Sequence, residues 1–259
     1  MRLYFPNEMN FVTNPNLPRD VKIVLIGEEY AQNLEIPLKN MGVIPIFVPN
    51  NPCVDNRIKG HADISVLHLG KNKLMLAPYL KGSGLDKKLS EIGMEIEYAD
   101  IIQNPFYPND AALNLCICGT KLIYNPKSVP SSIVDYLTIE EGLEKLIVKQ
   151  GYTKCSVCVV REDAIITSDE VIHKRAVEAG INSLKICEGY IELPGYDYGF
   201  IGGAAFKISH DTLAFTGNLN NHPDKNNILN FLSLHNINTV YITEFPAFDI
   251  GSAIQIVEK

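Results

Sequence analysis

The sequence has no apolar run of the roughly 18 to 20 residues that a membrane-spanning helix needs. Its first twenty residues, MRLYFPNEMNFVTNPNLPRD, also lack the uninterrupted apolar stretch that is typical of a signal peptide. From these two absences we expect a cytoplasmic protein without a membrane partner.

Concentrated positive charge is lacking as well. No long run of lysine or arginine occurs, and the formal net charge is −7. An acidic balance disfavours binding to phosphate backbones and to anionic lipid surfaces. We therefore expect no nucleic-acid partner, and a small cationic ligand is favoured instead.

A disulfide framework is not indicated, because the six cysteines of a cytoplasmic chain are expected to stay reduced. They remain open as buried side chains, metal ligands or a nucleophile. On strands, Cys116 and Cys118 would share a face, whereas Cys155 and Cys158 would point to opposite faces, so the four cannot easily form one tetrahedral site. The glycine-rich segment GFIGGAAF precedes a strand rather than a helix, which disfavours phosphate binding. We expect neither a metal nor a cofactor.

What the sequence does contain is self-similarity. Four segments share a pattern of two short strands joined by a turn, namely DISVLHLGKNKLMLAP, AALNLCICGTKLIYNP, CSVCVVREDAIITSD and GAAFKISHDTLAFTG. In each, an apolar residue that ends the first strand is followed five positions later by one that starts the second, as with Leu69 and Leu74. The copies recur at about 48 residues, with one interval near 43.

A helical segment and a further strand follow each hairpin, as in SDEVIHKRAVEAG and then SLKICE. A fifth unit is divided between the chain ends: GSAIQIVEK supplies its first strand, and DVKIVLIGEEYAQNLEIPLKNMGVIPIFVP supplies its second strand, helix and third strand. Pairing of the two ends would close a ring and leave few exposed strand edges. We predict an α/β protein with an N-terminal extension (residues 1–20) and one domain (residues 21–259) of five strand-strand-helix-strand units.

This unit pattern resembles the pentein fold, a five-fold α/β-propeller, of the guanidino-group modifying enzymes, which include arginine deiminases, dimethylarginine hydrolases and amidinotransferases. The motifs VDNRIKGHADIS, YPNDAALN, QGYTKCS and GFIGGA are similar to those of an uncharacterised bacterial family that is grouped with this fold. The resemblance implies a pentein fold, with chemistry at the beginnings of the first strands, and it implies no assigned reaction.

Those strand beginnings carry small and polar residues. Since the first strands converge on one axis, large side chains there would overlap, and small ones are expected. If the ring closes, the residues at these positions surround one pocket. The candidate residues are His61, Asp63, Asp110, Asn114, Lys154, Cys155, Gly203, Asp249 and Ser252.

His61 and Asp63 resemble the His-x-Asp element of the deiminases, which implies an acid/base role for the histidine and a cation-binding role for the aspartate. Alternate residues of a strand face the same side, so both could reach one ligand. The alternative is a histidine that makes a structural hydrogen bond at the mouth of a strand. Asp110 and Asp249 would complete a negative cup for a guanidinium, amidine or amine, unless they only cap turns.

The resemblance also implies a nucleophilic cysteine in the last unit, but this chain reads FDIGSAIQIV there and has no cysteine after Cys187. Ser252 lies near that place and would need a general base. Cys155 is the candidate replacement, because the neighbouring Lys154 would lower its pKa. Lys154 could instead bind a carboxylate of the ligand, and Cys155 could be an ordinary buried thiol.

The sequence therefore predicts an axial polar pocket for a small cationic ligand in a protein that could be an amidino-group hydrolase or transferase. The alternative is a non-catalytic binding module, as the ribosome anti-association factors of this fold are. Phe106 and Tyr107 leave a homo-oligomer open as well.

Overall fold

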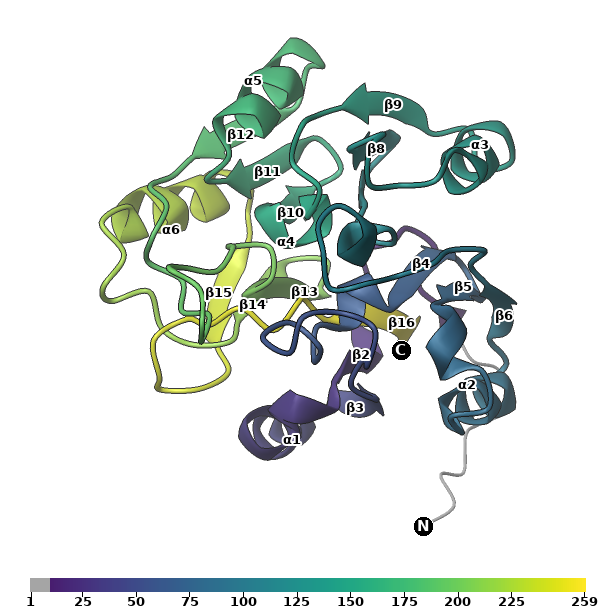
Figure 1. Cartoon of the computed structure of the whole chain (residues 1–259). Helices are drawn as coiled ribbons and strands as arrows, with labels where there is room; N and C mark the ends of the chain where they lie inside the picture. The colour runs from purple at the N-terminus through teal and green to yellow at the C-terminus, as the bar shows by residue number, and fades with distance from the viewer. Residues whose placement is uncertain (1–9) are drawn as a thin grey trace.

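A ring of small sheets makes up the fold in the computed structural model, which describes residues 10–259 (Figure 1). Four sheets have three strands each, in the orders β4-β5-β6, β7-β8-β9, β10-β11-β12 and β13-β14-β15. In every one the first two strands form an antiparallel hairpin, and the third runs parallel to the second after a helix. The predicted strand-strand-helix-strand unit is confirmed.

The elements of these four units follow one another in the same order along the chain. They are β4 (Val66–Gly70), β5 (Lys73–Leu76), α2 (Leu85–Ile92) and β6 (Glu95–Tyr98); β7 (Cys116–Cys118), β8 (Lys121–Tyr124), α3 (Ser131–Ile139) and β9 (Glu144–Ile147); β10 (Val157–Arg161), β11 (Ala164–Thr167), α5 (Glu170–Glu178) and β12 (Asn182–Lys185); and β13 (Ala205–Ser209), β14 (Thr212–Phe215), α6 (Lys225–Leu234) and β15 (Asn238–Tyr241).

The fifth unit joins the two ends of the described chain. Its strands are β1 (Asn10–Phe11), β2 (Val21–Gly27), β3 (Ile44–Val48) and β16 (Ile254–Glu258), with α1 (Ala31–Asn40) between β2 and β3. The C-terminal strand β16 pairs antiparallel with β2, and β1 pairs with the other edge of β16. This pairing is the predicted closure of the ring.

Residues 10–20, the described part of the predicted N-terminal extension, lie against the ring. The backbone N–H of Val12 donates to the carbonyl of Ile256 at 3.1 Å. The Asn16 side chain donates to the carbonyl of Ile117 at 2.9 Å, at the end of the axis away from the site described below. The boundary at residue 20 stays a prediction.

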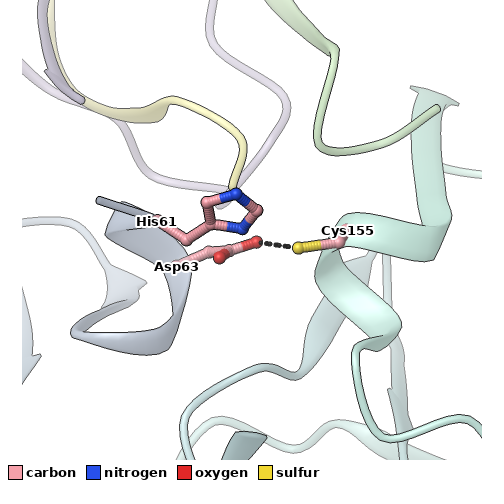
Figure 2. A group of neighbouring side chains, drawn as sticks. All are labelled: His61, Asp63 and Cys155. Atoms are coloured by element: carbon pink, nitrogen blue, oxygen red, sulfur yellow. Dashed lines mark hydrogen bonds between the residues drawn. The ribbon is translucent and has the colours of Figure 1, made fainter. Parts of the chain in front are cut away.

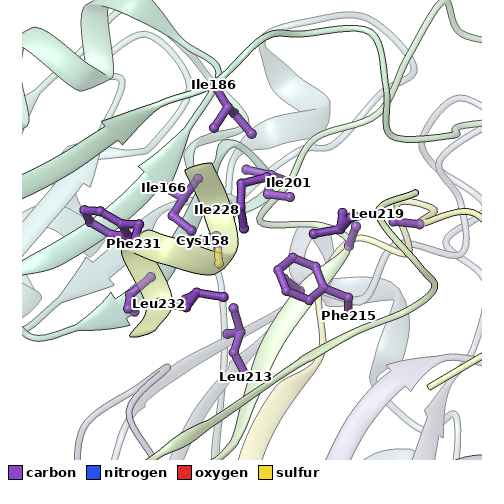
Figure 3. Close-up of a cluster of buried hydrophobic side chains, with 14 of the residues drawn as sticks. Cys158, Ile166, Ile186, Ile201, Leu213, Phe215, Leu219, Ile228, Phe231 and Leu232 are labelled. Carbon is purple, nitrogen blue, oxygen red and sulfur yellow. The ribbon is translucent and has the colours of Figure 1, made fainter. Parts of the chain in front are cut away.

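Hydrophobic packing binds each unit to its neighbours. Five buried clusters each combine residues of two adjacent units, so that the five contacts run once around the ring. Figure 3 shows one of them, in which Cys158 and Ile166 of one unit meet Leu213, Phe215 and Leu232 of the next. Burial of this apolar surface, at about 25 cal/mol per Å², is the main force that holds the ring together.

The longer helices, α1, α2, α3, α5 and α6, are placed on the outside of the ring by their amphipathic sequences (Figure 1). In α5, Asp169 is the N-cap and accepts a hydrogen bond from the Ile172 N–H at 2.8 Å, while Ile172 and Ala176 are buried. None of the helices in residues 10–259 is long and apolar enough to cross a membrane.

Short helical turns, rather than strands, lead into three of the inner strands. They are Ala62–Ile64, Asn109–Ala111 and α4 (Thr153–Ser156). The prediction that His61 and Asp63 lie on a strand is therefore wrong, since β4 begins only at Val66. Within the first of these turns the Ser65 N–H donates to the Ala62 carbonyl at 3.0 Å, so part of the backbone is satisfied locally.

Ring closure predicts a stability effect at Ile256, which is fully buried on β16 among residues of two units. Ile256→Ala removes buried methyl and methylene groups and leaves a cavity, so it should lower the free energy of unfolding by about 2–5 kcal/mol. Urea unfolding followed by circular dichroism measures the change.

The matched control is Ile139→Ala, because Ile139 of α3 is 74% exposed. It should change the free energy of unfolding by less than about 0.5 kcal/mol. Equal effects of the two substitutions would contradict the role given to β16.

Candidate functional site

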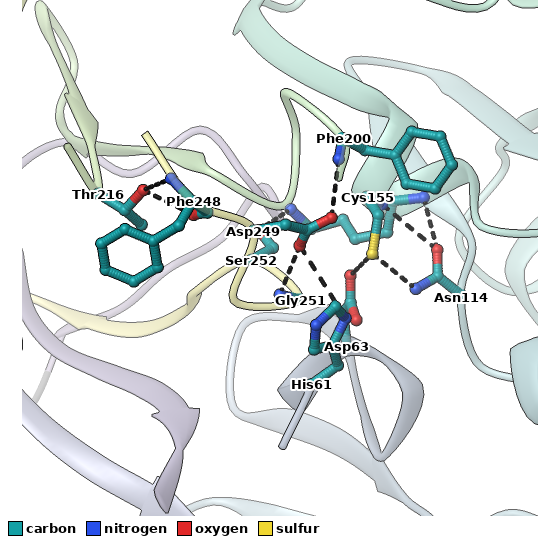
Figure 4. A network of polar contacts seen from close by, with 11 residues as sticks. His61, Asp63, Asn114, Cys155, Phe200, Thr216, Phe248, Asp249, Gly251 and Ser252 are labelled. Atoms are coloured by element: carbon teal, nitrogen blue, oxygen red, sulfur yellow. Dashed lines mark hydrogen bonds and ion pairs between the residues drawn. The ribbon is translucent and has the colours of Figure 1, made fainter. Parts of the chain in front are cut away.

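The entrances of the five inner strands meet at one end of the ring axis, and backbone hydrogen bonds tie four of them together. Asp63 N–H donates to the Gly251 carbonyl at 3.2 Å, and Gly203 N–H donates to the Cys155 carbonyl at 2.9 Å. Ser252 N–H donates to the Gly203 carbonyl at 3.1 Å. Residues that are far apart in the sequence are thus brought to a single point, as Figure 4 shows.

A cavity of about 350 Å³ opens over this point. Three of the sequence-predicted residues, His61, Cys155 and Asp249, lie in its wall. The other lining residues are Ile58, Gln150, Tyr152, Leu193, Tyr196, Asp197, Tyr198 and Phe200. A volume of this size suits a small-molecule ligand.

Cys155 is the centre of a buried polar network. Its thiol donates to Asp63 Oδ2 at 2.8 Å, and Asn114 Nδ2 lies 3.4 Å from its Sγ (Figure 2, Figure 4). Asn114 Oδ1 accepts from the Lys154 N–H at 2.8 Å, which fixes the amide. All three side chains, of Cys155, Asp63 and Asn114, are buried.

Electrostatics keep this thiol protonated in the free protein. Burial, together with the negative charges of Asp63 and Asp249, raises the pKa of Cys155 well above its ordinary value. The expectation of a lowered pKa for Cys155 is wrong, because burial and the neighbouring carboxylates raise it. Burial also raises the pKa of Asp63 to about 6, against the opposing effects of His61 and the thiol hydrogen bond.

His61 stands beside Asp249 at the cavity wall. Its Nδ1 lies 4.0 Å from Asp249 Oδ1. The Asp249 carboxylate also accepts from the backbone N–H groups of Phe200 and Gly251, both at 2.8 Å. Within residues 10–259 the His61 Nε2 atom has no hydrogen-bond partner, although it is buried.

Two glycines make room for these side chains. A Cβ atom on Gly203 would lie 1.9 Å from Asp249 Oδ1, and one on Gly251 would lie 2.2 Å from the His61 Cβ. Gly251 also has a φ of +67°, in the left-handed region that favours glycine. Gly203 thus contacts Asp249, and its predicted contact with the ligand stays a prediction.

Lys154 and Ser252 lie deeper along the axis. Lys154 Nζ donates to Ser252 Oγ at 2.7 Å, and Ser252 has a φ of +62°, which is unusual for a residue with a side chain. Lys154 lines a second cavity of only about 20 Å³, together with Asp63. The predicted ligand contacts of Lys154 and Ser252 stay predictions.

Asp110 does not line the main cavity but contacts a residue that does. Its Oδ2 accepts from the hydroxyl of Tyr152 at 2.5 Å, and it is Tyr152 that lines the cavity. Burial raises the pKa of Asp110. Its predicted contact with the ligand stays a prediction.

A metal would find one group of ligands in the described residues. Ligand atoms of His61, Asp63 and Cys155 lie within 4.8 Å of one another. These are residue types that bind zinc, which would have to displace the thiol proton from its hydrogen bond to Asp63. The spacing argument considered Cys116, Cys118, Cys155 and Cys158 as one site, and it does not test a site made of His61, Asp63 and Cys155.

The aromatic wall of the cavity was not predicted. Tyr196, Tyr198 and Phe200 come from the segment ELPGYDYGF, between β12 and β13, which directly precedes an inner strand. Its density of aromatic residues just ahead of a strand entrance was the available signal. Arg57 fixes this segment by stacking on Tyr196, with its guanidinium carbon 4.1 Å from the ring centre.

Comparisons with known proteins agree with this architecture. The model of a family of unknown function, DUF6873, matches residues 25–254. A search of curated protein sequences found no match.

Solved structures with the same fold include enzymes that act on guanidino and amidino groups. An agmatine deiminase of C. jejuni with substrate bound has a TM-score of 0.61 and 11% identity, over 100% of this chain and 99% of that one. An amidinotransferase of Microseira wollei has a TM-score of 0.60 and 11% identity, over 96% and 98%. DDAH from Pseudomonas aeruginosa has a TM-score of 0.53 and 8% identity, over 86% and 92%. The predicted pentein fold is confirmed.

The state of the Cys155 thiol can be measured by alkylation. Asp63→Asn removes a negative charge beside Sγ and should lower the pKa of Cys155, so iodoacetamide should modify Cys155 at least about tenfold faster than in the wild type. Mass spectrometry of tryptic peptides separates Cys155 from the exposed Cys53 and Cys187.

Asp135→Asn serves as the control, because this carboxylate lies on the outer helix α3 with its side chain 56% exposed. It should leave the rate unchanged. Slower modification of Cys155 in Asp63→Asn would mean that Asp63 promotes the thiolate, contrary to the electrostatic argument.

Proposed function

Because this chain belongs to the DUF6873 family, whose function is unknown, we propose from its own site that it is an amidino-group hydrolase or transferase with a small cationic substrate. The observation that carries the proposal is the meeting of the Cys155 thiol, the His61 imidazole and the Asp249 carboxylate at the wall of one cavity, with Asp63 bonded to the thiol behind them. The names of the structural neighbours, agmatine deiminase and amidinotransferase, support the same class of reaction.

The polar atoms left without partners favour a ligand rich in N–H donors. In residues 10–259, Asp63 Oδ1, Asp110 Oδ1 and His61 Nε2 are all buried and have no hydrogen-bond partner. An unmade buried hydrogen bond costs about 1–3 kcal/mol. Of these three residues His61 lines the cavity, and a fitting ligand there would recover this cost at Nε2. A guanidinium or amidinium offers planar N–H donors and a positive charge to carboxylates.

Binding of such a cation would also prepare the nucleophile. The carboxylates of Asp63 and Asp249 raise the pKa of Cys155 in the free protein, and a positive ligand beside them offsets this effect. Asp63 already accepts the thiol hydrogen bond at 2.8 Å, so it is placed to take the proton. The thiolate would therefore form only when a substrate is present.

The reaction then follows from the placement of the groups. Cys155 Sγ forms a bond to the central amidino carbon while its proton passes to Asp63. A C–N bond breaks, and His61 gives a proton to the departing amine. Water, activated by His61, forms a C–O bond; the C–S bond breaks, the thiolate recovers its proton from Asp63, and a urea-type product and an ammonium ion remain. An amine in place of water gives transfer of the amidino group.

Removal of the thiol separates catalysis from binding. In Cys155→Ala, turnover of an alkylguanidine, measured as ammonium and urea-type product, should fall at least about a thousandfold while binding of the guanidine persists. The control is Cys187→Ser, which changes an exposed thiol and should keep full turnover.

Wild-type protein that binds the guanidine without turnover, with water or with an amine acceptor, would identify a binding module instead. That outcome has one feature in its favour, which is the raised pKa of the resting Cys155 thiol. Full turnover in Cys155→Ala would remove the covalent mechanism.

Ligand binding should depend on pH through Asp63, whose pKa is about 6. Below this value Asp63 is protonated and no longer attracts a cation, so the affinity for an alkylguanidine should fall as the pH drops from about 7 to about 5. Titration calorimetry on Cys155→Ala over this range measures it, and Asp63→Asn in that background should flatten the curve.

His61, Cys155, Asp249 and Lys154 also face Asp63. His61→Gln removes one of these ionisable groups and should keep the dependence that belongs to Asp63. An unchanged pH dependence in Asp63→Asn would assign the effect to another group.

A further inference from the structure

The cavity wall carries negative charge and no fixed positive charge. Among the lining residues in the described part of the chain there is no lysine or arginine. The ionisable carboxylates of the wall are Asp249, which is buried at its base, and Asp197, which is exposed. A substrate carboxylate would therefore find two negative groups and no lysine or arginine to pair with.

The nearest basic side chains are engaged elsewhere. The Arg57 guanidinium donates to both carboxylate oxygens of Asp55 at 2.8 Å and to the Gly195 carbonyl at 3.1 Å. Lys154 Nζ bonds Ser252 on the axis, outside the wall of the cavity. Neither cation is free to receive an anionic group of a ligand.

Two phenols of the wall have their O–H donors engaged with carboxylates. Tyr152 donates its hydroxyl proton to Asp110, and Tyr198 donates to Glu188 at 2.9 Å. Both hydroxyls are thus turned to carboxylates, and their rings face the cavity beside Ile58, Leu193 and Phe200. Between the two aspartates the wall suits an apolar chain.

We propose that the substrate carries no carboxylate and is cationic at both ends: a guanidino or amidino head at Asp249 and Cys155, an alkyl chain, and an amine near Asp197. This specificity rests on the proposed function and adds to it. Guanidino compounds with a terminal carboxylate are disfavoured because the wall offers that group the repulsion of Asp249 and Asp197 and no lysine or arginine. An ammonium near Asp197 gains a modest, salt-dependent attraction, since Asp197 is exposed.

Three compounds with the same guanidino head and chain length test the preferred charge at the other end of the substrate, here called the tail. They are 4-guanidinobutylamine, butylguanidine and 4-guanidinobutanoate, with a positive, a neutral and a negative end. At low salt the amine should bind about two- to fivefold more tightly than butylguanidine, and the carboxylate at least about tenfold more weakly than the amine. Dissociation constants come from calorimetry on Cys155→Ala, and values of kcat/KM come from the wild type.

Asp197→Lys reverses the charge near the tail of the substrate and should reverse the preference for its charge. It should bring 4-guanidinobutanoate to within a few-fold of butylguanidine, or past it, and should weaken the amine. Glu178→Lys, at the outer end of α5, makes the same charge change away from the cavity and should alter none of the three ratios.

The outcomes separate the two proposals. If none of the three compounds binds or turns over, the proposed function fails. If all three bind with equal affinity, or if the carboxylate binds best to the wild type, the proposed function stands and the inferred tail specificity is overturned.

Discussion

The pairing of β16 with β2 is the constraint on which the rest of this structure depends. It places the first strand of the fifth unit, from the C-terminus, beside strands from the N-terminus and so closes the ring. Only a closed ring brings the entrances of all five inner strands to one axis. The hydrophobic clusters run around the same ring, so that stability and the position of the site share one cause.

The site itself opposes stability. Asp63, Asp249 and the Cys155 thiol lie together in a buried place where negative charges repel one another and lose water. Small residues and backbone N–H groups hold them there: Gly203 and Gly251 leave space, and Phe200 and Gly251 donate to Asp249. A cluster that is costly when empty and balanced by a cation suits a binding site better than a structural network.

The sequence predicted the architecture well because the same strand pattern recurs in five units, so each unit supports the assignment of the others. The slot that ends each first strand also locates the entrances, which is why His61, Cys155 and Asp249 were expected together. The local geometry was less accessible: Asp63 lies in a helical turn, and the sign of the pKa shift at Cys155 depends on burial that no spacing reveals. The aromatic wall comes from an irregular segment, where periodicity gives no information.

Equivalence of the five entrances also bears on the cysteine that the last unit lacks. Ser252 stands near the position where the resemblance implies a cysteine, whereas Cys155 comes from another unit. Gly203 connects the two, since its N–H donates to the Cys155 carbonyl and its carbonyl accepts from the Ser252 N–H. The two positions are thus neighbours on one axis, with Cys155 in the wall of the cavity and Ser252 fully buried behind it. A closed five-fold ring requires only that its entrances converge, so the chemistry can move from one unit to another while the fold is retained.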